Sequence, residues 1–474
     1  MPVWFLAAVL LLPLLGVGFL NDDFVGIADL GPRGWALVVQ ELHPKDFEFL
    51  RPLGFLVFRS ELSLFGARAW LFHASQLALF LLAAGLAGAL ASRLAGPRAA
   101  AWVAALALLY PGRIEVVAWT AAIFDLLALL LTSAALLLAT SRGWDRRPAR
   151  ALWLAAICFL APLAKESAYT IPIALLAWEA LGVLSPATPF MRLIRCGSGL
   201  AGAALAFGYR ILALGGIGGY AGTSIAAAVS RAKSLPEMVA RTVFVPVNPT
   251  YGMASRLLAG LCIAAVGAAL GGLFFREGRR AVRPVTAGLV LAVCGLLPAM
   301  PYLNPIDLVW SHSRFVTITG MGVALATGIA LAAAPPRWTK FVGVFLLSVW
   351  AATTVLNELP WLGAGRCRDA ILAGVELATR GPGVHSVWVA GDIDEYRGAR
   401  LLGGDLAEAV KLEMPNRSIH VDSEFLQRWQ QRPVGPPKAG PGETLHVFEF
   451  DPSPPRLVAI GTWPPSGRVP SAPR

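Results

Sequence analysis

Two adjacent carboxylates, Asp22 and Asp23, follow a run of about 20 apolar residues, which is long enough to cross a bilayer as a helix. The pair is therefore expected where the first span meets water. A carboxylate at that position can act as a general base on a hydroxyl group. Ionisable groups are costly at a membrane face and indicate a functional site. The alternative interpretation is that the acidic pair merely ends the span.

Further charged residues stand at the ends of apolar runs or inside them. They are Arg51, Glu115, Asp125, Lys165, Glu166 and Arg314. Guanidinium groups bind phosphate, often through two parallel hydrogen bonds, and a lysine would add a further cation. Such cations stabilise the negative charge that gathers on a departing phosphate. With Asp22 or Asp23 as base, this set suits sugar transfer from a lipid-linked phosphate to a hydroxyl group.

Each of these charges also has a simpler interpretation. Lys165 and Glu166 could form a hairpin tip that touches water. Asp125 lies inside its apolar run, where a structural ion pair with a nearby arginine or lysine is the favoured explanation. Arg314 could be an interfacial residue whose charged head reaches the membrane surface. What favours a single site is that Arg51, Glu115, Lys165, Glu166 and Arg314 are predicted to share the face that carries the Asp pair.

The composition is typical of a polytopic membrane protein. Of the 474 residues, 56% are hydrophobic and 15% are charged, whereas soluble domains carry about 25% charged residues. We expect an all-α bundle of about eleven transmembrane helices. The apolar windows are 2–20, 70–92, 98–111, 115–140, 151–164, 168–184, 194–214, 255–274, 284–301, 315–334 and 340–357.

Basic residues orient these predicted spans, because every second loop between them is basic. The loops in question contain Arg93 and Arg98; Arg142, Arg146, Arg147 and Arg150; Arg192 and Arg195; Arg276, Arg279, Arg280 and Arg283; and Arg337 and Lys340. Positive loops stay in the cytoplasm. The N-terminus is then cytoplasmic. The Asp pair lies on the outer face, as do Arg51, Glu115, Lys165, Glu166 and Arg314, whereas Asp125 lies inside its span. The net charge of +11 thus reflects membrane topology, and we expect no binding of nucleic acid.

Two domains are predicted. Residues 1–357 form the membrane domain, with long outer segments at 21–69 and 215–254, and residues 358–474 form a small extracytoplasmic α/β module. The module has candidate strands at His385–Ala390, His446–Phe450 and Leu457–Ile460 and a helical stretch near Leu402–Leu412. Its end is rich in proline and is expected to be irregular. The five cysteines lack metal-ligand spacing, so we expect no zinc site.

Five motifs in order resemble those of the C-type (GT-C) integral-membrane glycosyltransferases. They are NDDF at 21–24, RPLGFLVFR at 51–59, YPGRIEVVAW at 110–119 with Asp125 beyond it, LAKESAYTIPIALLAWE at 163–179 and SRFVTITGMG at 313–322. The resemblance covers roughly residues 1–334 and is closest to the protein O-mannosyltransferase-like branch that often carries tetratricopeptide repeats. No such repeat array follows here.

This resemblance implies a GT-C-like fold and inversion at the sugar carbon. Asp22 or Asp23 would be the catalytic base, with the first position favoured. Arg51, Lys165 and Arg314 would contact the donor phosphate or hold its surroundings. The residues expected to shape the site are Glu115, Glu166 and Asp125.

The implied partners are a polyprenyl-phosphate sugar donor, the lipid bilayer, and a glycan, lipid or protein acceptor. The expected location is the bacterial inner membrane, and a divalent cation, Mg²⁺ or Mn²⁺, at the Asp pair is left open. Two other functions remain in view: a transporter or flippase for a lipid-linked glycan, and an inert envelope scaffold.

Overall fold

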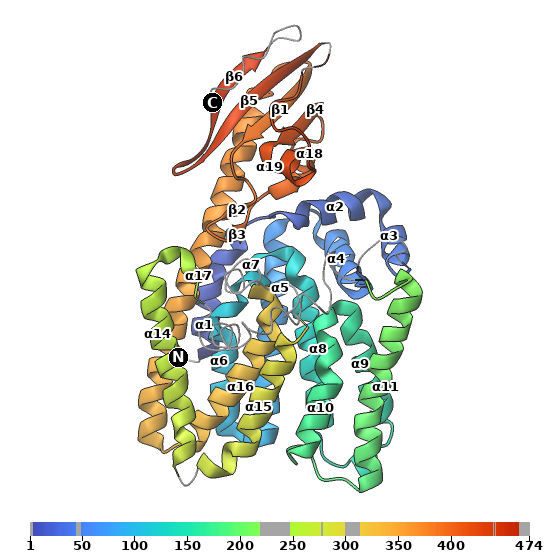
Figure 1. Ribbon diagram of the computed structural model, residues 1–474, viewed down its shortest axis with the longest axis vertical. Helices are drawn as coiled ribbons and strands as arrows, with labels where there is room; N and C mark the ends of the chain where they lie inside the picture. Colours follow the sequence, from blue (N-terminus) through green and yellow to red (C-terminus); the bar gives the residue numbers. More distant parts are fainter. Residues whose placement is uncertain are drawn as a thin grey trace.

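The protein is a helical bundle with a small α/β module at one end (Figure 1). The computed structural model describes residues 3–43, 49–218, 247–275, 278–298, 313–438, 440 and 442–463. Most of the predicted outer segment 215–254 therefore lies outside the described residues, as do positions 299–301 of the predicted span 284–301.

Helices account for the membrane domain. The α-helices are α1 Val3–Leu11, α2 Asp22–Arg33, α3 Trp35–Gln40, α4 Pro52–Phe65, α5 Ala69–Ala95, α6 Pro97–Leu109, α7 Ile114–Ala118, α8 Ile123–Ala139, α9 Arg150–Ala164, α10 Ile171–Ala180, α11 Pro189–Leu214, α14 Met253–Gly271, α15 Val282–Leu296, α16 Thr317–Ala333 and α17 Pro336–Ala378. Short 3₁₀ segments that bear on the site are η1 Leu12–Gly16, η2 Pro111–Arg113, η3 Thr120–Ala122, η4 Trp144–Arg146, η5 Glu166–Thr170 and η11 Ser313–Val316.

Every predicted apolar window contains a helix, but fewer of these helices are long enough to cross a bilayer than the eleven expected. Six described helices pass by length and composition, and α6 with η2–α7 makes a seventh if that pair, bent by 57°, counts as one span. The remaining apolar helices are shorter; Arg150–Ala164 and Val282–Leu296, for example, have 15 residues each. The predicted first span divides into α1 and η1 beside Pro13, where a ring without an N–H interrupts the helical ladder. The chain is a multi-pass membrane protein in which several apolar helices are shorter than a full span.

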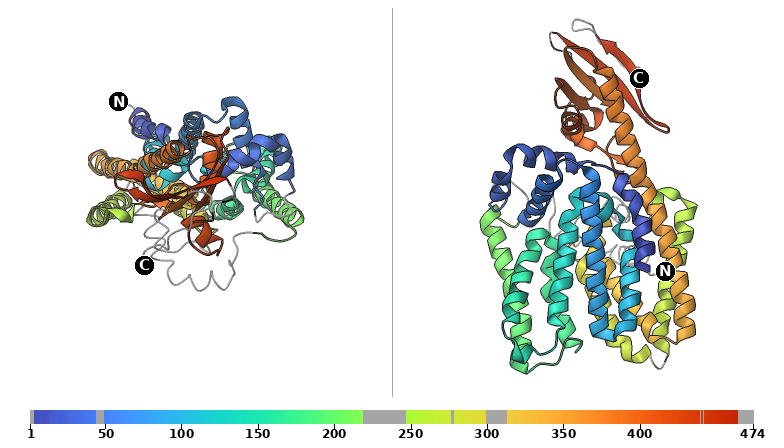
Figure 2. Two further views of the ribbon diagram at one scale, coloured as in Figure 1. Left: turned by 90° about the horizontal axis from the view of Figure 1, so that it is seen from above. Right: turned by 180° about the vertical axis from the view of Figure 1, so that it is seen from behind.

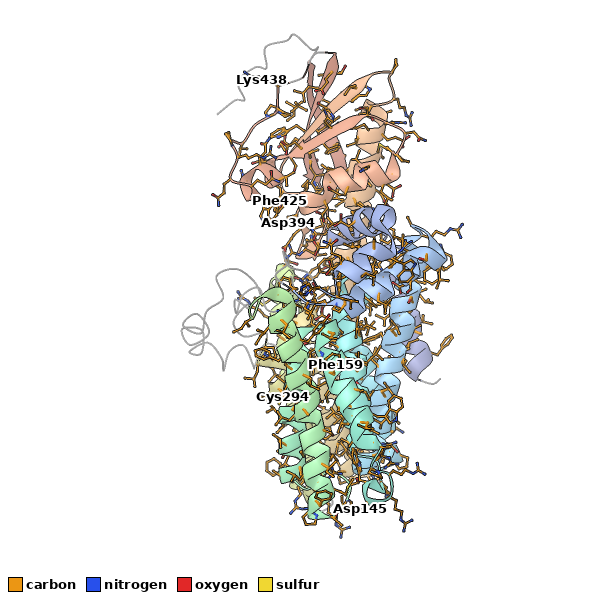
Figure 3. The ribbon with its side chains drawn as sticks, turned by 90° about the vertical axis from the view of Figure 1, so that its right-hand side faces the viewer. Asp145, Phe159, Cys294, Asp394, Phe425 and Lys438 are labelled. Carbon is orange, nitrogen blue, oxygen red and sulfur yellow. The ribbon has the colours of Figure 1, made fainter. Side chains whose placement is uncertain are left out.

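The basic loops gather at the end of the bundle that is remote from the module. Arg98 Nη2 donates to Thr339 Oγ1 at 3.0 Å, which joins the start of α6 to the start of α17. A cavity at this end is lined by Arg93 from the last turn of α5, Arg142 after α8 and Pro186 before α11. Figure 3 places Asp145 of η4 at this same end. Basic loops predicted to share one side of the membrane thus lie at one end of the bundle, whereas the side that this end faces stays a prediction.

The module is a four-stranded sheet with helices against it. Its strands are β1 Val384–Ala390, β4 Ile419–Ser423, β5 Glu443–Pro452 and β6 Pro455–Trp463, in the order β4-β1-β5-β6. The helices are α18 Leu406–Glu413 and α19 Glu424–Trp429, and a small β2 Glu395–Tyr396 and β3 Ala399–Arg400 pair lies beside them. β1 runs parallel to both β4 and β5, whereas β5 and β6 form an antiparallel hairpin. The predicted strands fall within β1, β5 and β6, and the predicted helical stretch overlaps α18.

Helix α17 connects the bundle to the module without a break (Figure 2, right). The expected domain boundary at 357/358 falls inside this helix, so the division into two domains stays a prediction. Arg368 of α17 donates to the carbonyl of Phe19 at 3.0 Å. Gly18, with φ of +76°, leaves the space for this guanidinium, because a Cβ there would overlap it. α17 thereby fixes the segment that leads into the Asp pair.

The module also touches α2 directly, next to the Asp pair. The N–H of Asn21 donates to the carbonyl of Leu401 at 2.9 Å. Gly403 has φ of +52°, and a Cβ there would lie 2.7 Å from Asn21 Nδ2 and 2.8 Å from Asp394 Oδ1. Figure 3 shows Asp394 and Phe425 at this junction, between the sheet and the bundle. The module is therefore seated at the end of the bundle opposite the basic loops, beside the residues predicted to do chemistry; we call this the outer end after the side that the sequence predicts for it.

Candidate active site

The candidate residues stand where helices begin, end or break. Asp22 opens α2, Arg51 is the residue before α4, and Lys165 follows the last residue of α9. The others occupy equivalent positions: Glu115 in the one-turn helix α7, Asp125 in the first turn of α8, Glu166 at the start of η5 and Arg314 in η11. A helix end leaves backbone donors and acceptors without intrahelical partners. Breaks at the outer end thus provide polar positions inside an otherwise apolar bundle.

These helix ends surround one cavity of about 320 Å³. Asp22 and the three cations Arg51, Lys165 and Arg314 all line it. The remaining lining residues are mostly apolar and aromatic: Val25, Gly26, Asp29, Leu30, Leu37, Glu41, Phe49, Phe55, Phe58, Trp119, Ala121 and Phe124. The structure therefore brings one predicted base and all three predicted phosphate ligands to the same space.

The two adjacent aspartates have different environments. Asp22 is exposed and lines the cavity. Asp23 is fully buried, and its two carboxyl oxygens accept the N–H groups of Leu20 at 2.9 Å and Ala121 at 2.6 Å. Burial raises the pKa of Asp23 to about 8, against the opposing effect of these two hydrogen bonds. Asp23 ties the start of α2 to η3, and only Asp22 of the pair faces the cavity.

Arg314 is held by a carboxylate that is itself buried. Glu115 has no exposed surface. Its Oε2 accepts the backbone N–H of Arg314 at 2.8 Å and the hydroxyl of Ser313 at 3.0 Å, and its Oε1 accepts the Arg314 guanidinium. The guanidinium carbon lies 4.5 Å from the centre of the Trp119 ring. These contacts fix both the backbone and the charged head of Arg314 at the cavity wall.

Lys165 is paired in a similar way. Its Nζ lies 2.7 Å from Asp125 Oδ2, and both side chains are about 95% buried, at 5% and 4% exposure. The structural ion pair predicted for Asp125 is therefore confirmed. Burial lowers the pKa of Lys165 to about 8; Asp125 opposes this shift, while Arg51 and Arg314 add to it. The effect of these two arginines is consistent with the three cations lying close together.

Glu166 joins two arginines from distant parts of the chain. It accepts Arg51 Nη2 at 2.7 Å and Arg210 Nη1 at 2.9 Å. Burial alone would raise the pKa of Glu166, but the positive charges of Arg51 and Arg210 outweigh it and bring the pKa to about 2. Lys165 and Glu166 do connect α9 to η5 and α10, but they belong to the charge network, and Lys165 is buried instead of touching water.

Aromatic rings separate the cations and connect them to the Asp pair. Phe315 lies between two of them, 4.5 Å from Lys165 Nζ and 4.8 Å from the guanidinium carbon of Arg314. Trp119 packs on Arg314 and donates its indole N–H to the carbonyl of Leu20 at 3.0 Å. Such rings attract cations and exclude water from around them.

Three residues of this region did not emerge from the sequence. Arg210 lies in an apolar window near the outer end of α11, and its position alone could have signalled a charged partner. Asp29 and Glu41 line the cavity from α2 and the turn after α3. They come from stretches that resemble ordinary surface helix, so no sequence signal sets them apart.

The Asp pair does not fit a divalent cation. Asp23 is buried and each of its oxygens already accepts a backbone N–H. Within the described part of the chain, no group of three or more histidine, cysteine, aspartate or glutamate side chains could hold a metal ion. Three cations of the chain itself, Arg51, Lys165 and Arg314, line the cavity.

Comparison with known proteins gives only distant structural likenesses. No family model and no curated protein matches the sequence. The fold is similar to that of ArnT from Cupriavidus metallidurans, solved with undecaprenyl phosphate, with a TM-score of 0.49 and 13% identity over 95% of this chain and 93% of that one. It is also similar to the Archaeoglobus fulgidus oligosaccharyltransferase, with a TM-score of 0.45 and 13% identity over 86% of this chain and 61% of that one.

A mycobacterial arabinofuranosyltransferase, AftD, gives a TM-score of 0.46 at 16% identity, over 94% of this chain and 36% of that one. This chain spans about three fifths of the length of the archaeal enzyme. With TM-scores below 0.5, these likenesses establish neither a family nor an activity for the chain. The O-mannosyltransferase-like branch stays a prediction, and the functional argument rests on the cavity.

Proposed function

We propose that the protein is a membrane glycosyltransferase that moves a sugar from a polyprenyl-phosphate donor to an acceptor hydroxyl on the outer face. The observation that carries this proposal is the cavity in which exposed Asp22 shares the lining with Arg51, Lys165 and Arg314. Sugar transfer needs a base that takes the proton of the acceptor hydroxyl, here a carboxylate. It also needs positive groups that bind the departing phosphate, here the three cations.

In the proposed reaction, the acceptor hydroxyl attacks the sugar carbon that bears the phosphate. Asp22 takes the hydroxyl proton as the new carbon–oxygen bond forms. The bond between the same carbon and the phosphate oxygen breaks on the opposite side, so the configuration inverts. The lipid monophosphate leaves with the electron pair, and the three cations stabilise its growing charge.

The pairing of each cation supports this role. A buried charge without a partner is costly. An unpaired buried lysine tends to become neutral, and an unpaired arginine tends to turn toward water. Glu115, Asp125 and Glu166 act from behind the cavity wall as positioning residues. Held in this way, the cations need little rearrangement when phosphate charge develops.

The apolar part of the lining suits the rest of the donor. Phe55, Phe58 and Phe124 stand on the α4 and α8 side of the cavity, where they offer flat surfaces to a sugar ring or the first isoprene units. Asp29 and Glu41 lie on the α2–α3 side. We assign carboxylates there to sugar or acceptor hydroxyls, which hydrogen-bond well to ionised oxygens.

The test is transfer by purified protein in liposomes that contain polyprenyl-phosphate sugars from a panel. The readout is release of polyprenyl monophosphate, which does not depend on knowing the acceptor product. Asp22→Asn should lower the rate by about 10²- to 10⁴-fold, the usual contribution of a general base. Asp23→Asn is the matched control, since it changes the adjacent carboxylate and should act through stability.

Turnover of Asp22→Asn at the wild-type rate would exclude Asp22 as the base. Movement of the intact donor across the membrane, with no glycosidic bond formed, would instead support a transporter.

A further inference from the structure

A second polar cavity lies at the opposite, basic end of the bundle. Its volume is about 510 Å³, and it lies between the α5 end, the α8–α9 loop and the α10–α11 loop. It is lined by Ser92, Arg93, Thr140, Ser141, Arg142, Arg150, Val183, Leu184, Ser185 and Pro186. The proposed transfer reaction makes no use of this cavity.

The charges of this cavity have one sign. Arg93, Arg142 and Arg150 line it, and no described carboxylate does. In the described chain no ion pair joins any of the three to an acid. Arg93 donates to the carbonyl of Leu137 and Arg150 to that of Arg142, which uses only part of each guanidinium.

The acids nearest in sequence to this cavity are engaged elsewhere. Glu179 pairs with Arg192 and Arg195. Asp145 accepts the hydroxyl of Thr188 at 2.8 Å and its N–H at 3.1 Å. The pKa of Arg150 is lowered, by burial and then by the positive charges of Arg147 and Arg93. An anion entering the cavity would relieve this repulsion.

The surroundings favour a lipid over a free ion. Leu152 and Trp153, directly after Arg150 on α9, are 75% and 67% exposed. Phe190 and Leu193, at the start of α11, are also exposed. Exposed apolar residues next to basic residues at a span end are typical of the level where acyl chains meet headgroups.

We propose that this cavity, the inner pocket, binds the phosphate headgroup of an anionic phospholipid. The three guanidinium groups would hold the phosphate oxygens. Ser92 would serve the polar part beyond the phosphate, whereas the hydroxyls of Ser141 and Ser185 donate to the carbonyls of Leu138 and Ser141. This inference is independent of the proposed transfer reaction.

The experiment uses the full chain in nanodiscs of phosphatidylcholine with increasing phosphatidylglycerol. Lipid that stays bound is counted by native mass spectrometry. Replacing Arg93, Arg142 and Arg150 by glutamine, singly and together, should weaken phosphatidylglycerol binding about fivefold for each arginine removed. Arg337→Gln is the control, since Arg337 is an exposed arginine at the start of α17 that does not line the inner pocket.

A second arm keeps the proposal testable if the triple variant folds poorly. Inorganic phosphate is added to wild-type protein in neutral detergent, and thermal unfolding is followed with and without phosphatidylglycerol. The lipid should raise the unfolding temperature and phosphate alone should not. A phosphate shift equal to the lipid shift would overturn the assignment to a lipid. Equal phosphatidylglycerol binding by wild type, the Arg337 control and the single variants would overturn the site itself.

Discussion

The two ends of the bundle use the same residue types in opposite ways. At the outer end, Arg51, Lys165 and Arg314 each have a carboxylate partner, in Glu166, Asp125 and Glu115 respectively. At the inner pocket, the described arginines Arg93, Arg142 and Arg150 line a cavity without a described acid. The outer cations are largely buried, at 13%, 5% and 11% exposure, whereas Arg93 and Arg142 are exposed.

This difference separates positioned charge from available charge. A buried cation paired with a buried acid has a fixed place and is partly neutralised, which suits a group that must meet charge developing at one point. Exposed arginines that are not paired with a described acid keep their positive potential, which attracts anions, and their side chains can adjust to the anion that binds. The former arrangement is expected at a site of chemistry and the latter at a site of binding.

The largest effect should come from breaking one outer pair. Arg314→Gln should reduce transfer by about 10²-fold or more, because a phosphate ligand is lost, and should cost about 3–5 kcal/mol of stability because buried Glu115 loses its cation. The double variant Glu115→Gln/Arg314→Gln should recover much of the stability but none of the transfer. Initial rates and chemical unfolding measure the two separately. Recovery of transfer in the double variant would show that Arg314 is structural.

Lys165 should give the outer cavity a pH dependence that the inner pocket lacks. Because its pKa is about 8, Lys165 is charged below that pH and neutral above it. The KM for the donor should therefore rise about tenfold between pH 7 and 10, the usual value of one hydrogen bond to a charged group. Lys165→Met should bind donor weakly throughout, with a flat profile. If the KM of Lys165→Met rose between pH 7 and 10 as it does in wild type, the rise would come from another titrating group.

The junction between module and bundle should matter less, by a few-fold. Gly403→Ala places a Cβ against Asn21 and Asp394 at a positive φ, which costs about 1–2 kcal/mol in backbone strain alone. The start of α2 would shift relative to the cavity, and transfer should fall. Gly404→Ala is the matched control, because its Cβ would meet only Leu426 at 3.5 Å. Equal transfer rates for the two variants would separate the module from the reaction.

The smallest effect on transfer is expected for Asp23, which acts through stability because its folded pKa of about 8 exceeds its ordinary value of 3.8. Between these values the unfolded chain releases the proton that the folded chain keeps. The free energy of unfolding contributed by Asp23 is therefore full below about pH 4 and is lost as pH rises toward 8. The unfolding temperature of wild type should fall from pH 5 to pH 8 by a few degrees more than that of Asp23→Asn. Parallel curves would mean that Asp23 is ionised in the folded protein.

The sequence was informative where charge interrupts apolar runs. Arg51, Lys165 and Arg314 could be chosen because each lies near an apolar run, and the alternation of basic loops placed them on one face. The contacts among these charges were harder to predict from the sequence. Glu166, for example, binds Arg210 of a helix 44 residues further along the chain, and no local pattern encodes that contact. The difference between Asp22 and Asp23 depends on the N–H of Ala121, 98 residues on, which only the fold brings near.

Span lengths were the least predictable part. Apolar windows located the helices, and windows such as 98–111 and 151–164 were already shorter than a full span in the sequence. The break beside Pro13, inside the window 2–20, was not predicted. The seat of the module on α2 likewise depends on Gly403 fitting against Asn21. Such a contact depends on two segments far apart in the sequence and cannot be predicted from either segment alone.

The most direct test of the account is a map of the full chain in nanodiscs with added polyprenyl monophosphate. The account predicts phosphate density in the outer cavity, within hydrogen-bonding distance of Arg51, Lys165 and Arg314, with the Asp22 carboxylate facing it and the lipid leaving between helices. Phosphate density only in the inner pocket, with the outer cavity empty at saturating ligand, would contradict it.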